Sequence, residues 1–138
     1  MSLFDLTGRV VIVTGGNGGI GLGMAQGMAA AGAAVSIWGR NEAKNAAALK
    51  SLANGKCEAR QCDVSDPASI ERAFNETLAK YGRVDGCFAN AGIGGGGRSS
   101  FIDRPQREWR QMLATNLDGA VLTMQHAARH MRDRAGKG

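Results

Sequence analysis

The sequence predicts an α/β protein in which a parallel sheet carries helices on both faces. Short apolar runs of strand length alternate with segments of helical length through the 138 residues, an order typical of β-α-β units with right-handed crossovers. The turn after the first apolar run, residues 14–21 (TGGNGGIG), is rich in glycine, as in Rossmann-type doubly wound sheets. We therefore expect strand order 3-2-1-4, with a ligand crevice between the first and fourth strands.

The first elements are two strands and two helices. The β-branched run Val10–Thr14 predicts a strand buried on both faces. A helix over 19–31 precedes a second strand over 34–38, and Asn41 is a capping residue for a helix over 42–53. The residues expected on the buried face of the first helix are Ile20, Met24, Met28 and Ala31, with Gly23 and Gly27 allowing close approach to the sheet.

The remaining elements continue the alternation. A third strand is predicted over 58–62, and Ser65-Asp66-Pro67 begins a helix that ends at Gly82. A fourth strand over 84–89 and a glycine-rich loop over 92–97 precede one long helix over 105–134. The apolar face of that last helix consists of Trp109, Met112, Leu113, Leu117, Val121 and Met124. We expect this face to be exposed in a sheet that ends at strand four, and to favour a homo-oligomer.

Composition narrows the class of protein. Apolar residues make up 43% and charged residues 21% of the chain, which suits a single globular domain over 1–138. No segment predicts a membrane span or a signal peptide, so we expect a cytoplasmic protein without a membrane partner. The three cysteines form no CxxC pair, so we expect buried free thiols and no metal site.

The net charge of +5 is concentrated toward the carboxyl end. Residues 98–138 carry 8 basic and 4 acidic side chains. A basic tail can indicate nucleic-acid binding, but these arginines lack interleaved aromatic residues. We interpret them as a solvated helix face and expect no nucleic-acid partner.

The glycine-rich turn predicts a phosphate site. The first backbone N–H groups of a helix that begins near Gly19 have no intrahelical partner and lie at the positive end of its dipole. A pyrophosphate can bind there, provided that no Cβ blocks its approach. We expect Thr14 to form a hydrogen bond within the turn.

The end of the second strand indicates which dinucleotide binds. An acidic residue there would bind the ribose 2′-OH of NAD, but this chain has Gly39 followed by Arg40. A guanidinium can bind a 2′-phosphate through charge-assisted hydrogen bonds, unless it points to solvent. Asn17 can also reach that phosphate. NADP is therefore the expected cofactor, with NAD less favoured.

Polar residues follow the third and fourth strands, where ligands bind in open sheets. Asp63 could accept a proton from the adenine amino group, or help to cap the next helix. The Asn90 amide could tie the two glycine-rich loops together, and Gly92 allows the backbone to lie close to a ribose. Asn116 lies on the apolar face of the last helix, where a buried asparagine needs hydrogen-bond partners.

Together these residues resemble the N-terminal half of a classical short-chain dehydrogenase/reductase. Four family motifs occur in order: the cofactor-binding Thr14-Gly15-x-x-x-Gly19-Ile20-Gly21, the adenine-contacting Asp63-Val64, the motif Asn90-Ala91-Gly92, and the tetrad asparagine Asn116. The resemblance implies that Asn116 is catalytic, because it kinks the helix and holds a water of a proton relay. It also implies pairing of subunits through this helix.

The resemblance implies an NADP(H)-dependent oxidoreductase that transfers hydride to or from a small carbonyl or alcohol substrate. The chain departs from the family because it lacks the catalytic Ser and Tyr-x-x-x-Lys. Its single tyrosine, Tyr81, lies on an earlier helix. We interpret the chain as part of a longer enzyme, truncated before the fifth strand and inactive alone. The alternative is a short regulatory module that binds nucleotide without catalysis.

Overall fold

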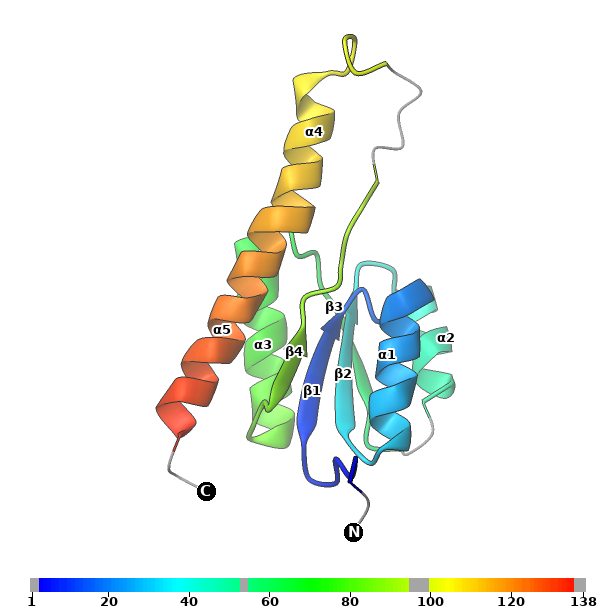
Figure 1. The fold of residues 1–138 in the computed structure, drawn as a ribbon, viewed down its shortest axis with the longest axis vertical. Coiled ribbons are helices and arrows are strands. Elements are labelled where there is room, and N and C mark those ends of the chain that lie inside the picture. Colours follow the sequence, from blue (N-terminus) through cyan, green and yellow to red (C-terminus); the bar gives the residue numbers. More distant parts are fainter. Residues whose placement is uncertain (1–2, 53–54, 95–99, 136–138) are drawn as a thin grey trace.

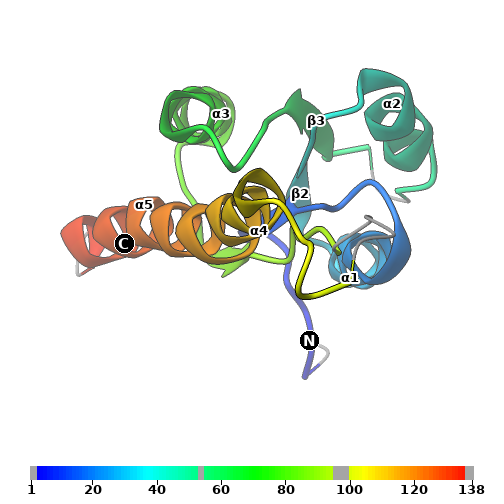
Figure 2. The same cartoon turned by 90° about the horizontal axis from the view of Figure 1, so that it is seen from above.

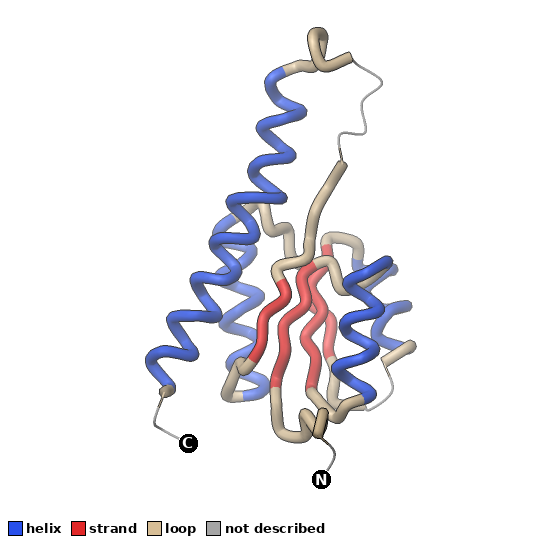
Figure 3. The backbone as a smooth tube through the Cα atoms, in the orientation of Figure 1, coloured by secondary structure: helices blue, strands red, loops and turns tan. Residues whose placement is uncertain are grey.

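A computed structural model describes residues 3–52, 55–94 and 100–135. Its centre is a parallel four-stranded sheet in the order β3-β2-β1-β4, as predicted. The elements in chain order are β1 (Val10–Thr14), α1 (Gly19–Ala30), β2 (Ala34–Gly39), α2 (Glu42–Lys50), β3 (Glu58–Gln61), α3 (Pro67–Tyr81), β4 (Gly86–Phe88), α4 (Gln106–Leu113), the π-helical segment η1 (Ala114–Asp118) and α5 (Gly119–Arg134). Helices α1 and α2 cover one face of the sheet and α3 and α5 the other (Figures 1, 2 and 3).

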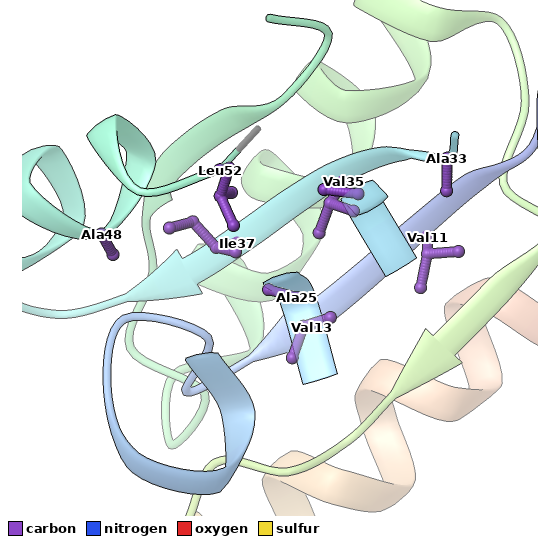
Figure 4. Packing of buried hydrophobic residues seen from close by; sticks show 9 residues of the cluster. Val11, Val13, Ala25, Ala33, Val35, Ile37, Ala48 and Leu52 are labelled. Atoms are coloured by element: carbon purple, nitrogen blue, oxygen red, sulfur yellow. The ribbon is translucent and has the colours of Figure 1, made fainter. Parts of the chain in front are cut away.

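Alternation along the strands supplies two apolar cores. Val13 and Ile37 face α1 and α2 and pack with Ala25 and Ala48 (Figure 4). The intervening residues, such as Ile12, face the opposite way and pack against α3 and α5. All residues of β1 and β2 are buried, because parallel strands with helices on both faces have no solvated side.

The buried face of α1 differs from the prediction. Its buried residues are Gly21, Ala25 and Ala29, whereas Met24 and Met28 are half-buried and Ile20 is 77% exposed. Gly23 and Gly27 are exposed, and a Cβ on either would meet no atom within 4 Å. The close approach to the neighbouring loops occurs at Gly21 instead, and this contact sets the rotation of the helix.

Other boundaries are shorter than predicted. Helix α2 ends at Lys50 and strand β4 covers only 86–88. The capping predictions are confirmed, since Asn41 Oδ1 accepts from Lys44 N at 2.9 Å and Gly82 ends α3 in the left-handed region. Only 92–94 of the predicted loop 92–97 lie within the described residues.

The last predicted helix contains a π-helical segment. Helices α4 and α5 are joined by η1, with Asn116 at its centre, and α4 extends beyond the carboxyl ends of the strands (Figure 1). Five of the six side chains predicted for the apolar face are between 38% and 55% exposed: Trp109, Leu113, Leu117, Val121 and Met124. Met112 is half-buried, so the expectation of an exposed apolar face is confirmed for the other five.

The amino ends of β1 and β4 are joined by one acidic side chain. Asp85 Oδ1 lies 2.6 Å from Arg83 Nη2 and 2.8 Å from Arg134 Nη2, and Asp85 Oδ2 accepts from Val10 N at 2.9 Å. Burial raises the pKa of Asp85, but the hydrogen bonds from Arg83, Val10 and Arg134 outweigh burial and hold this pKa well below its usual range.

A second carboxylate, that of Glu58 at the start of β3, forms hydrogen bonds with side chains of β2 and α3. Glu58 Oε1 accepts a hydrogen bond from Ser36 Oγ at 2.8 Å, and Trp38 Nε1 donates to Ser36 Oγ at 3.0 Å. Glu58 Oε2 pairs with Arg60 at 2.6 Å and with Lys80 at 3.3 Å. Glu58 is 5% exposed, so these partners compensate for the loss of its hydration.

Candidate functional site

A cleft lies at the carboxyl ends of the four strands, where the sequence places its candidate residues. It has a volume of about 200 Å³ and takes its walls from the segments that follow β1, β2, β3 and β4. The predicted site residues that line it are Gly15, Asn17, Arg40, Asp63, Val64, Ala91 and Gly92. Gly39, which the sequence predicts beside the cofactor, also lines it, and the lining residues that the prediction missed are Trp38, Asn41, Lys44, Cys62, Ile93 and Thr115. Most of the missed residues are sequence neighbours of the predicted ones, so the motif positions themselves were the available signal.

Two hydrogen bonds join the loops after β1 and β4. Asn90 Nδ2 donates to Thr14 O at 3.1 Å, as predicted for this amide. The Ala91 N–H donates to Thr14 Oγ1 at 2.9 Å. Thr14 therefore bonds across to the neighbouring loop and not within its own turn, which corrects the sequence prediction. The paired loops form one wall between the first and fourth strands.

The glycine-rich turn has the shape that a diphosphate needs. Gly15 and Gly19 have φ values of 65° and 53°, which favour glycine. A Cβ on Gly21 would overlap Gly15 O and Asn90 Nδ2, so only glycine allows α1 to begin this close to the turn. No side chain caps α1 at Gly18, and Ile20 beside it is largely exposed. This open helix start fits the phosphates of a dinucleotide.

Asp63 lies directly after β3 and lines the cleft. Its Oδ1 accepts hydrogen bonds from Ser65 N at 2.9 Å and Ser65 Oγ at 2.7 Å. Burial opposes ionisation, but these bonds and the charge of Arg40 lower the pKa of Asp63. The carboxylate is thus ionised at neutral pH. The two hydrogen bonds from Ser65 fix its orientation as a hydrogen-bond acceptor.

Two cationic side chains line the cleft beside the glycine that ends β2. Arg40 and Lys44 both line the cleft beside Gly39. Within the described ranges, neither cation forms an ion pair. Asn17 also lines this end, but its Nδ2 donates to Asn45 Oδ1 at 2.8 Å. Asn45, which the sequence analysis did not single out, is buried in α2.

Asn116 contacts the segment after β4 and is not itself among the residues that line the cleft. Its amide forms hydrogen bonds with both backbone groups of Ile93, and the neighbouring Thr115 is buried and lines the cleft. The residue itself is exposed rather than buried, so its partners come from the loop and not from a helix interface. π-Helical turns within α-helices, such as the one that contains Asn116, occur frequently at functional sites.

The cysteines behave as packing residues. Cys62 is buried and Cys57 and Cys87 are half-buried, and all three pack in or against the two apolar cores. Burial raises the pKa of Cys62, which lines the cleft, to about 11, and does the same for Cys87. Both thiols are therefore protonated near neutral pH, which makes them weak nucleophiles.

The part of the chain that the structure describes contains neither a candidate membrane span nor a candidate metal site. None of its helices has the length and apolar character that crossing a bilayer requires. Among the same residues, no three His, Cys, Asp or Glu side chains gather in a way that could hold a metal ion.

Comparisons with known proteins agree with the geometry. The family model for short chain dehydrogenases matches residues 9–138. The sorbose reductase of Schizosaccharomyces pombe is 34% identical over 141 residues, which cover 99% of this chain and 54% of the relative. The 3-oxoacyl-[acyl-carrier-protein] reductase of Chlamydia pneumoniae is 35% identical over 129 residues, which cover 91% of this chain and 51% of the relative. The chain thus spans about half the length of these curated relatives.

Solved structures match the fold as well. A 3-ketoacyl-(acyl-carrier-protein) reductase from Brucella melitensis, complexed with NADH, superposes with a TM-score of 0.89 at 29% identity. The match covers 96% of this chain and 54% of that structure. A short-chain type dehydrogenase/reductase from Mycobacterium marinum gives a TM-score of 0.88 at 32% identity, covering 96% of this chain and 52% of that structure.

Proposed function

We propose a function that starts from the family of this chain, which belongs to the short-chain dehydrogenases. In this proposal the chain is the cofactor-binding portion of an NADP(H)-dependent oxidoreductase. When bound, a nicotinamide cofactor in its reduced form would donate hydride to the carbonyl carbon of a small substrate, and in its oxidised form would accept hydride from the corresponding alcohol carbon. In this proposal, the turn 14–21 holds the diphosphate, Asp63 with Val64 binds the adenine, and the segment 90–92 lies along a ribose.

The observation that supports NADP is the chemistry beside Gly39. No carboxylate stands at the end of β2, and Arg40 and Lys44 line the same end of the cleft without an ion pair among the described residues. Two cations at this end of the cleft favour a dianionic 2′-phosphate over a 2′-hydroxyl. Asp63 lines the same cleft, and the charge of Arg40 contributes to its lowered pKa.

Titration of the protein with NADP and NAD tests this proposal. We expect NADP to bind more tightly, and Arg40→Ala to weaken NADP alone by about tenfold to a hundredfold, the worth of a charge-assisted hydrogen bond. Arg129→Ala, which removes an exposed arginine of α5, is the matched control and should leave both affinities unchanged. Equal affinities for the two cofactors in the unaltered protein would contradict the proposal.

The second candidate function is nucleotide binding without hydride transfer. It is favoured by the position of Tyr81, the single tyrosine of the sequence. Its hydroxyl donates to Lys56 O at 2.8 Å, next to the amino end of β3, whereas the cleft lies at the carboxyl ends. We therefore propose that the 138-residue chain alone binds the cofactor but reduces no carbonyl substrate. Turnover by a species of 14.4 kDa, confirmed by mass, would contradict this.

We also propose that a second copy of the chain covers the apolar face of α4, η1 and α5. The support is the row of half-exposed side chains described above, of which Leu117 is 55% exposed. Burial of such a row favours association through the hydrophobic effect. Light scattering of the protein and of Leu117→Arg measures this: we expect a dimer or larger species that the charge dissociates, and a monomer in both would exclude it.

A further inference from the structure

Two asparagines from different elements meet beside Gly39. Asn17 comes from the glycine-rich turn and Asn45 from α2, and the Asn17 amide donates to Asn45 Oδ1 at 2.8 Å. The other end of the Asn45 amide donates to Gly39 O at 2.8 Å and to Arg60 O at 3.1 Å. Asn45 therefore joins the carboxyl ends of β2 and β3. Its amide oxygen accepts the hydrogen bond from Asn17, which lies in the turn that follows β1.

This pair fills the space where a side chain at position 39 would begin. A Cβ built on Gly39 would lie closer than 3.0 Å to Asn17 Nδ2, Asn17 Cγ and Asn45 Oδ1. Gly39 does not have a positive φ, so its backbone would accept any residue if there were room. Asn45 is 4% exposed and holds two carbonyl groups, which leaves it little freedom to withdraw.

We infer that Asn17 and Asn45 are specificity-determining positioning residues, which exclude the carboxylate that an NAD-binding sheet carries at the end of β2. The inference rests on the proposed nicotinamide-cofactor function, because a carboxylate at this place recognises the 2′-hydroxyl of NAD. Selection against NAD then has two parts: residue 39 has no carboxylate, and the side chains of Asn17 and Asn45 leave no room for one. The same bond fixes the turn beside Arg40 and Lys44, which line this end of the cleft.

An acidic substitution at position 39 tests the inference in three backgrounds. Gly39→Asp is made in the unaltered protein, with Asn17→Ala, and with Asn17→Ala together with Asn45→Ala, and NAD binding is measured by calorimetry. We expect Gly39→Asp to leave NAD affinity nearly unchanged in the unaltered protein. With Asn17→Ala and Asn45→Ala together, the same substitution should raise NAD affinity about tenfold or more, as a charge-assisted hydrogen bond allows. With Asn17→Ala alone the gain should be smaller, because a Cβ at position 39 would still lie 2.5 Å from Asn45 Oδ1. A gain of equal size in all backgrounds would overturn the inference.

A matched control comes from a second amide bridge between α1 and the end of α2. Gln26 Nε2 donates to Ser51 Oγ at 3.2 Å on the exposed surface, and neither residue is among the closest neighbours of a Cβ at position 39. Gly39→Asp combined with Gln26→Ala should therefore bind NAD no better than Gly39→Asp alone. A gain in this background would mean that any loosening of the two helices suffices, which would also overturn the inference.

Stability gives a readout that needs no cofactor. Gly39→Ala should lower the urea midpoint in the unaltered protein, and should lower it much less with Asn17→Ala and Asn45→Ala together, because the added methyl then finds space. If Asn17→Ala does not fold, Asn17→Ser gives the same comparison with a short polar side chain. Equal losses in both backgrounds would overturn the inference. Weak NADP binding by the unaltered protein would instead contradict the proposed cofactor and leave this comparison intact.

Discussion

Asn116 forms hydrogen bonds with both backbone groups of Ile93: its Oδ1 accepts from Ile93 N at 2.8 Å and its Nδ2 donates to Ile93 O at 2.9 Å. The side chain thus pairs with the loop after β4 as a neighbouring strand would. Because Asn116 lies in the π-helical segment, the irregular turn of the helix and the path of the loop depend on each other.

Asn116→Ala should loosen this loop. Loss of two hydrogen bonds should lower the free energy of unfolding by about 1–2 kcal/mol, and should speed amide hydrogen exchange at Ile93. Gln125→Ala, an exposed amide on α5, should change neither quantity. Unchanged exchange at Ile93 would show that the loop keeps its path without the asparagine.

Two glycines of α1 should respond oppositely to alanine. In Gly21→Ala, the new methyl would collide with Gly15 O and with the Asn90 amide, so we expect lower stability and weaker cofactor binding. Gly23 is exposed and has open space around it, so Gly23→Ala should raise stability by about 0.5–1 kcal/mol. Urea denaturation and cofactor titration measure both. Equal effects would mean that the turn adapts to a side chain at Gly21.

Asp85 should make part of the stability depend on pH. Its pKa is lowered in the folded protein, so its contribution is fully present above the unfolded pKa, which is about 3.9. The contribution is lost as the pH falls below about 4 toward the folded pKa. Asp85→Asn should cost about 2 kcal/mol at pH 7, and denaturation curves should show a smaller difference between the two proteins at pH 3. A difference that does not change with pH would exclude this role.

The cysteines should differ in reactivity. The pKa of Cys62 is raised to about 11 and the residue is 2% exposed, so iodoacetamide at pH 8 finds little thiolate there. Cys57 is half-buried and should be alkylated first, as followed by mass spectrometry of the peptides. In 8 M urea, used as the unfolded control, about equal rates are expected for all three thiols. Faster modification of Cys62 than of Cys57 in the folded protein would contradict the burial described here.

The strand order and the glycine-rich turn could be predicted because they follow from local signals. Alternating strand-length and helix-length segments dictate a parallel sheet, and residues 14–21 follow directly after the buried run Val10–Thr14. Asn90 could be placed for the same reason, since the loops after β1 and β4 must meet at the switch point. Its bond to Thr14 O confirms that reasoning.

What could not be predicted depends on contacts between distant segments. Hydrophobicity favours Ile20 and the methionines as the buried face of α1, but the contact of Gly21 with Gly15 and Asn90 rotates the helix. Asn45 carries no local signal, because its partners Asn17, Gly39 and Arg60 come from three other parts of the chain. A single sequence shows its composition and its hydrophobic periodicity, but it does not show which distant residues become hydrogen-bond partners.

The three arginines around Asp85 also bear on when the domain can finish folding. Arg9 lies next to β1 and within 3.5 Å of Asp85, whereas Arg134 is the final residue of α5. The set of ion pairs around Asp85, which includes Arg9 just before β1, is therefore complete only after the last turn of α5 has been synthesised. We expect a growing chain to form its early β-α-β units first, and to gain its full resistance to proteases only when Arg134 has left the ribosome.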